Sequence, residues 1–207
     1  MILTSPVEQY LDTLPRPDDP VLAEMEQHAR RDRIPVVLAP TGAMLQVLAL
    51  ARGARRAVEV GTAIGVSTLY IARGLAPDGT IVSFEIDAER HGAAQDYLDR
   101  AGVGDRVDLR LEDARDGLQA LDGTFDFAFL DGVKLQYGDY FEMVAPLLAP
   151  GAVLAVDNVL QAGNVADPAA GERAQAMRAF NRRLLESDEF TATVTPVGDG
   201  VLVAVKR

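Results

Sequence analysis

The chain has 207 residues, of which 48% are hydrophobic and 25% charged, a balance typical of a globular protein with a full core. Its formal net charge of -11 disfavours nucleic acid as a partner, because an acidic surface repels phosphate backbones. Since the chain has no cysteine, disulfides, thiolate metal sites and a cysteine nucleophile are excluded, and a cytoplasmic location is expected.

The N-terminal residues predict an extension ahead of the central fold. Residues 1–20 are rich in proline and aspartate and indicate a loop with a short helix. They have neither the basic start nor the apolar stretch of a signal peptide. Residues 21–32 combine helical spacing with many charges, which predicts an exposed amphipathic helix. We therefore expect one domain over residues 1–207, with residues 1–34 as a helical extension.

Farther along the chain, strands and helices are expected to alternate. Residues 34–40, apolar between two prolines, predict a loop, and residues 42–52 predict a buried helix. Strands are expected at 57–60, 80–84, 106–111, 125–130 and 152–156, with helices near 66–75, 88–101, 114–121 and 137–148. This alternation predicts a parallel sheet with helices on both faces. No apolar run approaches the ~20 residues that span a bilayer, so no membrane partner is expected.

The C-terminal residues predict an antiparallel edge for this sheet. A helix is expected at about 172–187, followed by strands at 190–195 and 200–206. The segment 196–200 between the strands is a turn, so a hairpin closes the edge and brings the number of strands to seven. In such a sheet, ligands bind beyond the carboxyl ends of the strands, so the residues after each strand are candidates for a site.

The first strand ends in the glycine-containing turn VEVGTAIG, which predicts a ligand at the start of the next helix. Gly61 and Gly65 permit a tight turn and close backbone approach, and Ser67 can donate to a ligand carboxylate. Glu59 lies at the end of the first strand, where a carboxylate without a partner is costly. Glu85 ends the second strand, where a carboxylate can bind two ribose hydroxyls. The alternative is an ordinary strand-to-helix turn without a ligand, since glycine is common in such turns.

Other polar residues have simpler interpretations beside the functional ones. Asp113 and Ala114 follow the third strand, where an adenine ring would pack, but Asp113 can equally cap the next helix. The full GxGxxG dinucleotide fingerprint is absent, which argues against a nicotinamide oxidoreductase. His28 and His91 stand in charged helical surroundings and are interpreted as surface residues, with no Ser-His-Asp arrangement.

Two aspartates and an asparagine follow the fourth and fifth strands. Because the two strands are expected to be parallel neighbours, Asp131, Asp157 and Asn158 are predicted to meet at one rim of the sheet. Carboxylate and amide oxygens suit Mg²⁺, Mn²⁺ or Ca²⁺. The sequence therefore predicts a divalent metal site, and the alternative is that the two aspartates cap the segments that follow them.

The motifs VEVGTAIGVST, SFEID, FLDGVK, VDNVL, GNVADP and VGDGVLVAVK occur in this order over about residues 35–207. Together they resemble the caffeoyl-CoA and catechol O-methyltransferase family, and the succession of DGVK and DN is the most specific part. The resemblance implies an α/β, Rossmann-like class I methyltransferase fold. Its seven-stranded, mostly parallel sheet has the order 3-2-1-4-5-7-6.

The resemblance also implies roles for the candidate residues. It places Glu59, Gly61 and Ser67 at the methionine end of S-adenosylmethionine, Glu85 at the ribose, Asp113 and Ala114 at the adenine, and Thr41 and Gly42, ahead of the first core helix, against the cofactor. Asp131, Asp157 and Asn158 match the metal ligands, Asp131 also borders the cofactor, and Lys134 matches the lysine near the acceptor hydroxyl. Asp131 and Lys134 are therefore the expected catalytic residues.

The implied reaction transfers a methyl group from S-adenosylmethionine to a hydroxyl of a small catechol-like or vicinal-diol acceptor. A divalent metal holds this acceptor, and Mg²⁺ is expected in preference to Mn²⁺ or Ca²⁺. It needs no covalent nucleophile, which agrees with the absence of cysteine. The resemblance implies a homodimer, with residues 1–34 at the interface or over the acceptor pocket. Val133, Gln136 and Gln161 depart from residues that many relatives carry, which leaves the acceptor's identity open.

Three other functions remain as alternatives. One is a methyltransferase that acts on a nitrogen or a single hydroxyl without using metal, which EDTA sensitivity would separate from the first. Another is a nicotinamide oxidoreductase, which a nicotinamide-binding test would settle. The third is a non-catalytic binding protein on a retained fold, against which the complete set of candidate ligands argues.

Overall fold

The computed structural model of the chain describes residues 18–207 together with Tyr10, Thr13 and Leu14. Its centre is one seven-stranded sheet in the order β3-β2-β1-β4-β5-β7-β6. The strands are β1 (Arg56–Val60), β2 (Thr80–Glu85), β3 (Val107–Leu111), β4 (Phe125–Leu130), β5 (Leu148–Val156), β6 (Phe190–Thr195) and β7 (Val201–Lys206). Strands β1 to β5 pair in parallel, and β7 is antiparallel to both β5 and β6. The α/β class, the strand order and the closing hairpin predicted from the sequence are confirmed.

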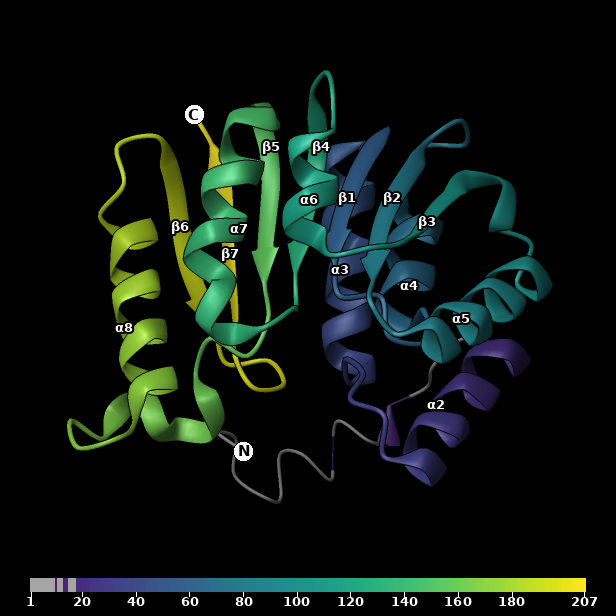
Figure 1. Cartoon of the computed structure of the whole chain (residues 1–207), viewed down its shortest axis with the longest axis horizontal. Helices are drawn as coiled ribbons and strands as arrows, with labels where there is room; N and C mark the ends of the chain where they lie inside the picture. The colour runs from purple at the N-terminus through teal and green to yellow at the C-terminus, as the bar shows by residue number, and fades with distance from the viewer. Residues whose placement is uncertain (1–9, 11–12, 15–17) are drawn as a thin grey trace.

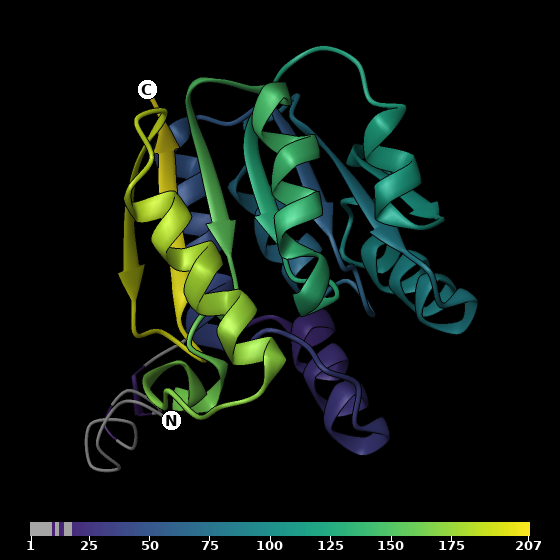
Figure 2. The ribbon, with the colours of Figure 1, turned by 60° about the vertical axis from the view of Figure 1, so that its left-hand side comes forward.

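Helices cover both faces of the sheet (Figure 1). One face packs against α2 (Pro20–Asp32), α3 (Ala39–Arg52), α4 (Val66–Gly74) and α5 (Ala88–Arg100), and the other against α6 (Ala114–Gln119), α7 (Tyr137–Val144) and α8 (Glu172–Leu185). Figure 2 shows α7 and α8 in front of the sheet and α3 behind it. Short 3-10 turns lie at Gly104–Arg106 (η1), Lys134–Gln136 (η2), Ala145–Leu147 (η3) and Gln161–Ala166 (η4). Among the described residues, no helix combines the length and apolarity required to cross a bilayer.

The first core helix begins earlier than the sequence predicts. Residues 34–40 were expected to form a loop, but α3 begins at Ala39 with Pro40 in its first turn. Proline is well suited to this place, because the N–H that it lacks has no partner in the first turn of a helix. Thr41 and Gly42 consequently lie inside the helix, rather than ahead of it.

The region before β5 also differs from the prediction. The helix expected over 137–148 ends at Val144 and continues as η3, in which Pro146 lies in the first turn. Proline cannot donate the hydrogen bond that would extend α7, which explains the earlier end. Strand β5 begins at Leu148 instead of residue 152, with an irregular register against β4 at its start. The other predicted helices and strands begin and end within two residues of the observed ones.

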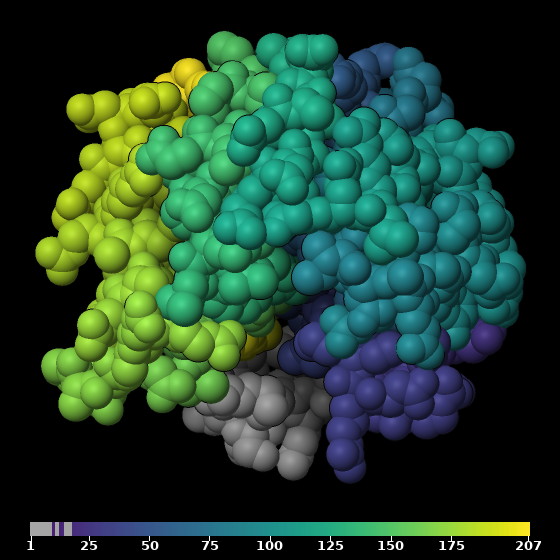
Figure 3. Space-filling model, viewed as in Figure 1, coloured from purple at the N-terminus to yellow at the C-terminus, as the bar shows by residue number. Residues whose placement is uncertain are grey.

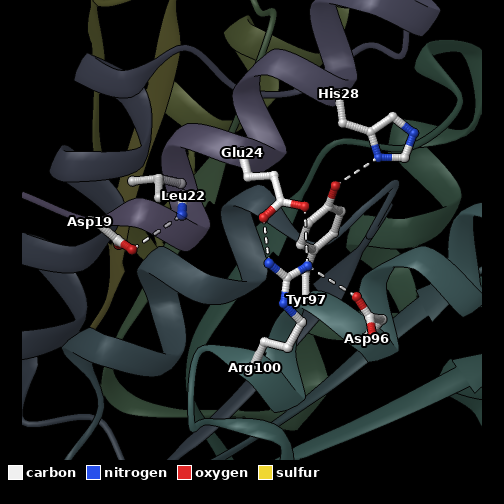
Figure 4. A network of polar contacts seen from close by, with 7 residues as sticks. All are labelled: Asp19, Leu22, Glu24, His28, Asp96, Tyr97 and Arg100. Atoms are coloured by element: carbon white, nitrogen blue, oxygen red, sulfur yellow. Dashed lines mark hydrogen bonds and ion pairs between the residues drawn. The ribbon is translucent and has the colours of Figure 1, made fainter.

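A polar network anchors the N-terminal helix α2 to α5 (Figure 4). Arg100 of α5 pairs with Glu24 of α2 and lies 3.2 Å from a carboxylate oxygen of Asp96. In the same network, Nδ1 of His28 lies 3.0 Å from the hydroxyl of Tyr97. The helical extension predicted over residues 1–34 is thus an integral part of one helical layer from α2 onward. The prediction for residues 1–17 falls largely outside the described residues.

Both histidines are partly exposed, and each also contacts a neighbouring element. His28 is half-buried, because α2 turns Met25 and Ala29 toward the core and His28 stands at the margin of that face. His91 is half-buried on α5, with Nε2 3.3 Å from the carbonyl oxygen of Leu109. Both rings therefore stabilise contacts between elements.

Candidate functional site

The strand register brings the predicted residues to one edge of the sheet. Leu130 of β4 pairs with Val60 of β1 on one side and with Val156 of β5 on the other. The next residue after β4, Asp131, donates its N–H to the carbonyl of Val60 at 2.8 Å. Likewise, the N–H of Asp157 donates to the carbonyl of Leu130 at 3.1 Å. The carboxyl ends of the three central strands, which point to the lower edge in Figure 1, therefore place Asp131 beside Asp157.

Close packing at this edge requires glycine after β1. Gly61 has a φ of 95°, and a Cβ built on it would lie 2.5 Å from the carbonyl oxygen of Asp131. Any side chain would displace the β1–α4 turn from the end of β4. Gly65, which precedes α4, also has a left-handed φ, of 89°. The turn predicted from the sequence is thus present, and it lies against Asp131.

Glu59, near the end of β1, is a completely buried carboxyl group. Its Oε2 accepts hydrogen bonds from the hydroxyls of Thr68 at 2.5 Å and Ser83 at 2.6 Å, and Ser67 bonds to the same carboxyl. Its Oε1 is buried with no partner among the described residues. Burial raises the pKa of Glu59 to about 6 against the opposing effect of these hydroxyls. An unpaired, closed-in carboxylate oxygen suits a cationic ligand group.

The raised pKa of Glu59 predicts that the ligand-free protein becomes less stable as pH rises. Because the folded-state pKa of about 6 exceeds the ordinary 4.5, protonation of Glu59 favours the folded state. This stabilisation is complete below pH 4.5 and is lost as pH rises through 6. The loss is about 2 kcal/mol. Glu59→Gln keeps an oxygen acceptor without titrating, so it should gain about this much relative to the wild type between low and neutral pH. Urea unfolding of both ligand-free proteins across this range measures the difference, and a difference that does not vary with pH would contradict the assignment.

Glu85, the last residue of β2, links two segments at the same edge. Its Oε2 accepts the N–H of Ala63 at 2.7 Å, and its Oε1 accepts those of Ile86 and Asp87, each at 2.9 Å. The side chain therefore holds the β1–α4 turn against the start of α5. The carboxylate is nearly buried and fixed in one orientation, and Oε2, which accepts one N–H, has remaining acceptor capacity.

The residues predicted at the adenine have local structural roles. Asp113 caps α6 by accepting the N–H of Arg115 at 2.9 Å, and it also pairs with the guanidinium of Arg115 at 2.8 Å. The capping interpretation of Asp113 is thus correct, and its contact with a cofactor stays a prediction. Ala114 is buried beside it. At the first turn of α3, Thr41 and Gly42 are buried.

A cluster of buried and half-buried polar side chains occupies the ends of β4 and β5. Nζ of Lys134 lies 2.5 Å from Oδ1 of Asp131 and 2.7 Å from the hydroxyl of Tyr137. The Tyr137 hydroxyl donates to the carbonyl oxygen of Asp157 at 3.1 Å, which joins the two strand ends. Tyr137 is not among the residues predicted from the sequence, although its position three residues after Lys134 is a helical spacing that could have indicated this contact.

The electrostatics of this cluster favour a bound cation. Burial raises the pKa of Asp131 against the effect of Lys134. Burial also raises the pKa of Asp157 to about 7, and the charge of Asp131 adds to the increase. Oδ1 of Asp157 is buried without a partner among the described residues. Carboxylate oxygens are donors that hard divalent cations prefer, and here two carboxylates lie close together, one of them with an oxygen that has no partner among the described residues.

Asn158 completes the predicted ligand set with an amide. It is half-buried and has a φ of 57°, in the left-handed region. No group of three or more His, Cys, Asp or Glu side chains in the described part of the chain has an arrangement suited to a metal. The predicted set instead combines two carboxylates with one amide, so its role as a metal site stays a prediction.

Comparison with known proteins identifies the family. The family model for O-methyltransferases matches residues 16–207. The chain is 35% identical to a catechol O-methyltransferase of Mycobacterium tuberculosis, over 97% of this chain and 95% of that one. It is 32% identical to a probable caffeoyl-CoA O-methyltransferase of Dictyostelium discoideum, over 79% and 72% of the two chains. The solved O-methyltransferase of Bacillus cereus in complex with SAH superposes with a TM-score of 0.89 at 33% identity, over 98% of this chain and 97% of that one. The resemblance inferred from the motifs is confirmed, and the chain belongs to the family of S-adenosylmethionine-dependent O-methyltransferases.

Proposed function

We propose that the protein methylates one hydroxyl of a small catechol-like or other vicinal-diol acceptor, and that Asp131, Asp157 and Asn158 bind a divalent cation. Mg²⁺ is the cation that we propose in preference to Mn²⁺ or Ca²⁺. The observation that carries the proposal is the pair of carboxylates at adjacent strand ends, of which Asp157 is buried and has one oxygen without a partner among the described residues. The relatives named catechol and probable caffeoyl-CoA O-methyltransferase support the acceptor class.

The proposed cofactor contacts lie along the ends of β1 and β2. The unpaired oxygen of Glu59 suits the ammonium of the methionine end, and Ser67 can donate to its carboxylate. Gly61 lets the β1–α4 turn pack closely against the end of β4, and Glu85 offers the oriented oxygen Oε2 to a ribose hydroxyl. The remaining proposed contacts are Thr41, Gly42, Asp113, Ala114 and Asp131.

On the acceptor side, the chain's own residues supply orientation and charge. A divalent cation, when bound, lowers the pKa of a coordinated hydroxyl. Lys134, held by Asp131 and Tyr137, can direct its ammonium at the developing phenolate. Because methyl transfer from a sulfonium is an in-line displacement, orienting the acceptor oxygen supplies much of the rate enhancement, up to ~7–11 kcal/mol in favourable systems.

A methyl-transfer assay with a panel of catechols, with and without Mg²⁺, tests the function. EDTA should abolish turnover, and Mg²⁺ or Mn²⁺ should restore it, because the carboxylate pair loses its counter-charge without metal. Matched monohydroxy and amine acceptors serve as controls, and they should react slowly. Full activity in a rigorously metal-free preparation would refute the metal-dependent mechanism and favour a nitrogen or single-hydroxyl acceptor.

We further propose that residues 1–207 form one domain, since both core clusters pack on the same sheet. The family resemblance supports a homodimer, and the absence of cysteine supports a cytoplasmic location. Light scattering on the purified protein tests the oligomeric state, and a monomer at working concentration would overturn it.

A further inference from the structure

We propose that the turn between β6 and β7, residues 196–200, braces the loop that follows β5, and that Asp199 is the positioning residue of this brace. The braced loop, residues 158–163, begins at Asn158, so the inference rests on the proposed function of that residue. The closing motif VGDG, which contains Asp199, has no role in the function derived above.

The loop after β5 has a backbone that needs external support. Asn158, Gln161 and Ala162 have φ values of 57°, 48° and 53°, and Gly163 follows with 87°. Residues other than glycine seldom adopt this region, and such conformations persist where surrounding contacts hold them. The conformation of the loop therefore depends on its neighbours.

The β6–β7 turn supplies three of the hydrogen bonds that hold this loop. Oδ1 of Asp199 accepts the N–H of Ala162 at 2.5 Å, and the carbonyl of Asp199 accepts the N–H of Leu160 at 3.0 Å. The carbonyl of Gly200 accepts the N–H of Val159, also at 3.0 Å. The loop and the turn thus pair along their backbones, with one carboxylate fixing the strained residue.

The same turn contacts the cofactor side of the site. A Cβ built on Gly198, whose φ is 58°, would lie 2.6 Å from the side-chain hydroxyl oxygen of Thr41 in α3. In Figure 3, atoms of the yellow C-terminal segment show between the green segment and the dark blue segment at this edge. The turn therefore lies between the first turn of α3 and the loop that carries Asn158.

Asp199 also places a negative charge on the turn that pairs with the loop beginning at Asn158. Its side chain therefore has two separable properties: the oxygen fixes Ala162, and the negative charge attracts cations to this edge.

The far end of the connection to α8 has its own support. Arg178 of α8 donates to the carbonyls of Val165 at 3.2 Å and Asp167 at 2.7 Å. The carboxylate of Asp167 accepts the N–H of Ala169 at 2.9 Å. Loss of Asp199 should therefore release the Asn158 end alone, and Asp167→Ala is a matched control in the same connection.

The test compares Asp199→Ala and Asp199→Asn with the wild type and Asp167→Ala. Asp199→Ala should raise both the acceptor KM and the Kd for Mn²⁺, measured by calorimetry, by about tenfold, because a hydrogen bond to a charged group is lost. S-adenosylmethionine affinity should stay within about twofold in every variant. Asp199→Asn, which keeps an oxygen for Ala162, should recover the acceptor KM but not the full Mn²⁺ affinity. Asp167→Ala should match the wild type throughout.

Hydrogen exchange of the ligand-free protein separates the brace from the proposed function. In Asp199→Ala, the amides of residues 160–163 should exchange at least about tenfold faster, while those of β5 keep their protection. Unchanged exchange together with unchanged KM would overturn the brace. An equal loss of cofactor affinity and metal affinity, accompanied by a lower melting temperature, would also overturn it. Metal-independent turnover of the wild type would overturn the proposed function alone. Should Asp199→Ala fail to fold, Asp199→Leu, which has a similar shape but no acceptor for the Ala162 N–H, takes its place in the exchange and Mn²⁺ measurements.

Discussion

Asp157→Ala should lower turnover by at least about a hundredfold while leaving S-adenosylmethionine affinity nearly unchanged. Asp157 directly follows β5 and lies beside Asp131, and its buried Oδ1 has no partner among the described residues. The substitution removes one anionic ligand and leaves Asp131 and Asn158 with an incomplete set. The acceptor would then lose both its orientation and its acidification, whereas the proposed contacts at Glu59 and Glu85 remain.

Turnover, cofactor affinity and melting temperature should be measured on the same Asp157→Ala preparation. Asp139→Ala, at an exposed aspartate in the first turn of α7, controls for loss of a negative charge nearby. In the alternative interpretation, Asp157 only caps the segment after it, and its removal would cost about 1 kcal/mol of stability. Near-normal turnover with a lowered melting temperature would therefore contradict the proposed role of Asp157 as a metal ligand.

Glu85→Ala should weaken S-adenosylmethionine binding by roughly ten- to hundredfold, because an oriented acceptor for the ribose hydroxyls is lost. The structure adds a second reason for a large effect. Glu85 also accepts the N–H of Ala63, a non-glycine residue with a φ of 48°, so its loss loosens the β1–α4 turn as well.

Calorimetric titration of the cofactor measures this effect, and circular dichroism checks the fold. Glu89→Ala, which removes an exposed carboxylate from the first turn of α5, is the matched control and should bind normally. Glu85→Gln separates the two contributions, since an amide oxygen can replace one carboxylate oxygen but not both. Wild-type affinity in folded Glu85→Ala would exclude the ribose role.

The alternation of apolar runs and helical segments in the sequence was enough to predict the sheet, because strand and helix periods are local properties of the chain. The positions of Asp131 and Asp157 directly after two apolar strands also predicted that they meet. Parallel neighbouring strands end at one edge, and the observed register follows this rule. The boundaries that failed lie at Pro40 and Pro146, where proline can begin a helical turn or end one.

The contacts that shape the candidate site came only from the tertiary structure. The hydrogen bond from Ala162 to Asp199 joins residues 37 positions apart, and the one from Tyr137 to Asp157 joins residues 20 apart. No local period encodes such pairs, because they depend on how β7, α7 and the loop after β5 pack together. The unpaired oxygens of Glu59 and Asp157 were equally invisible in the sequence, since burial and hydrogen bonding exist only once the whole sheet has assembled.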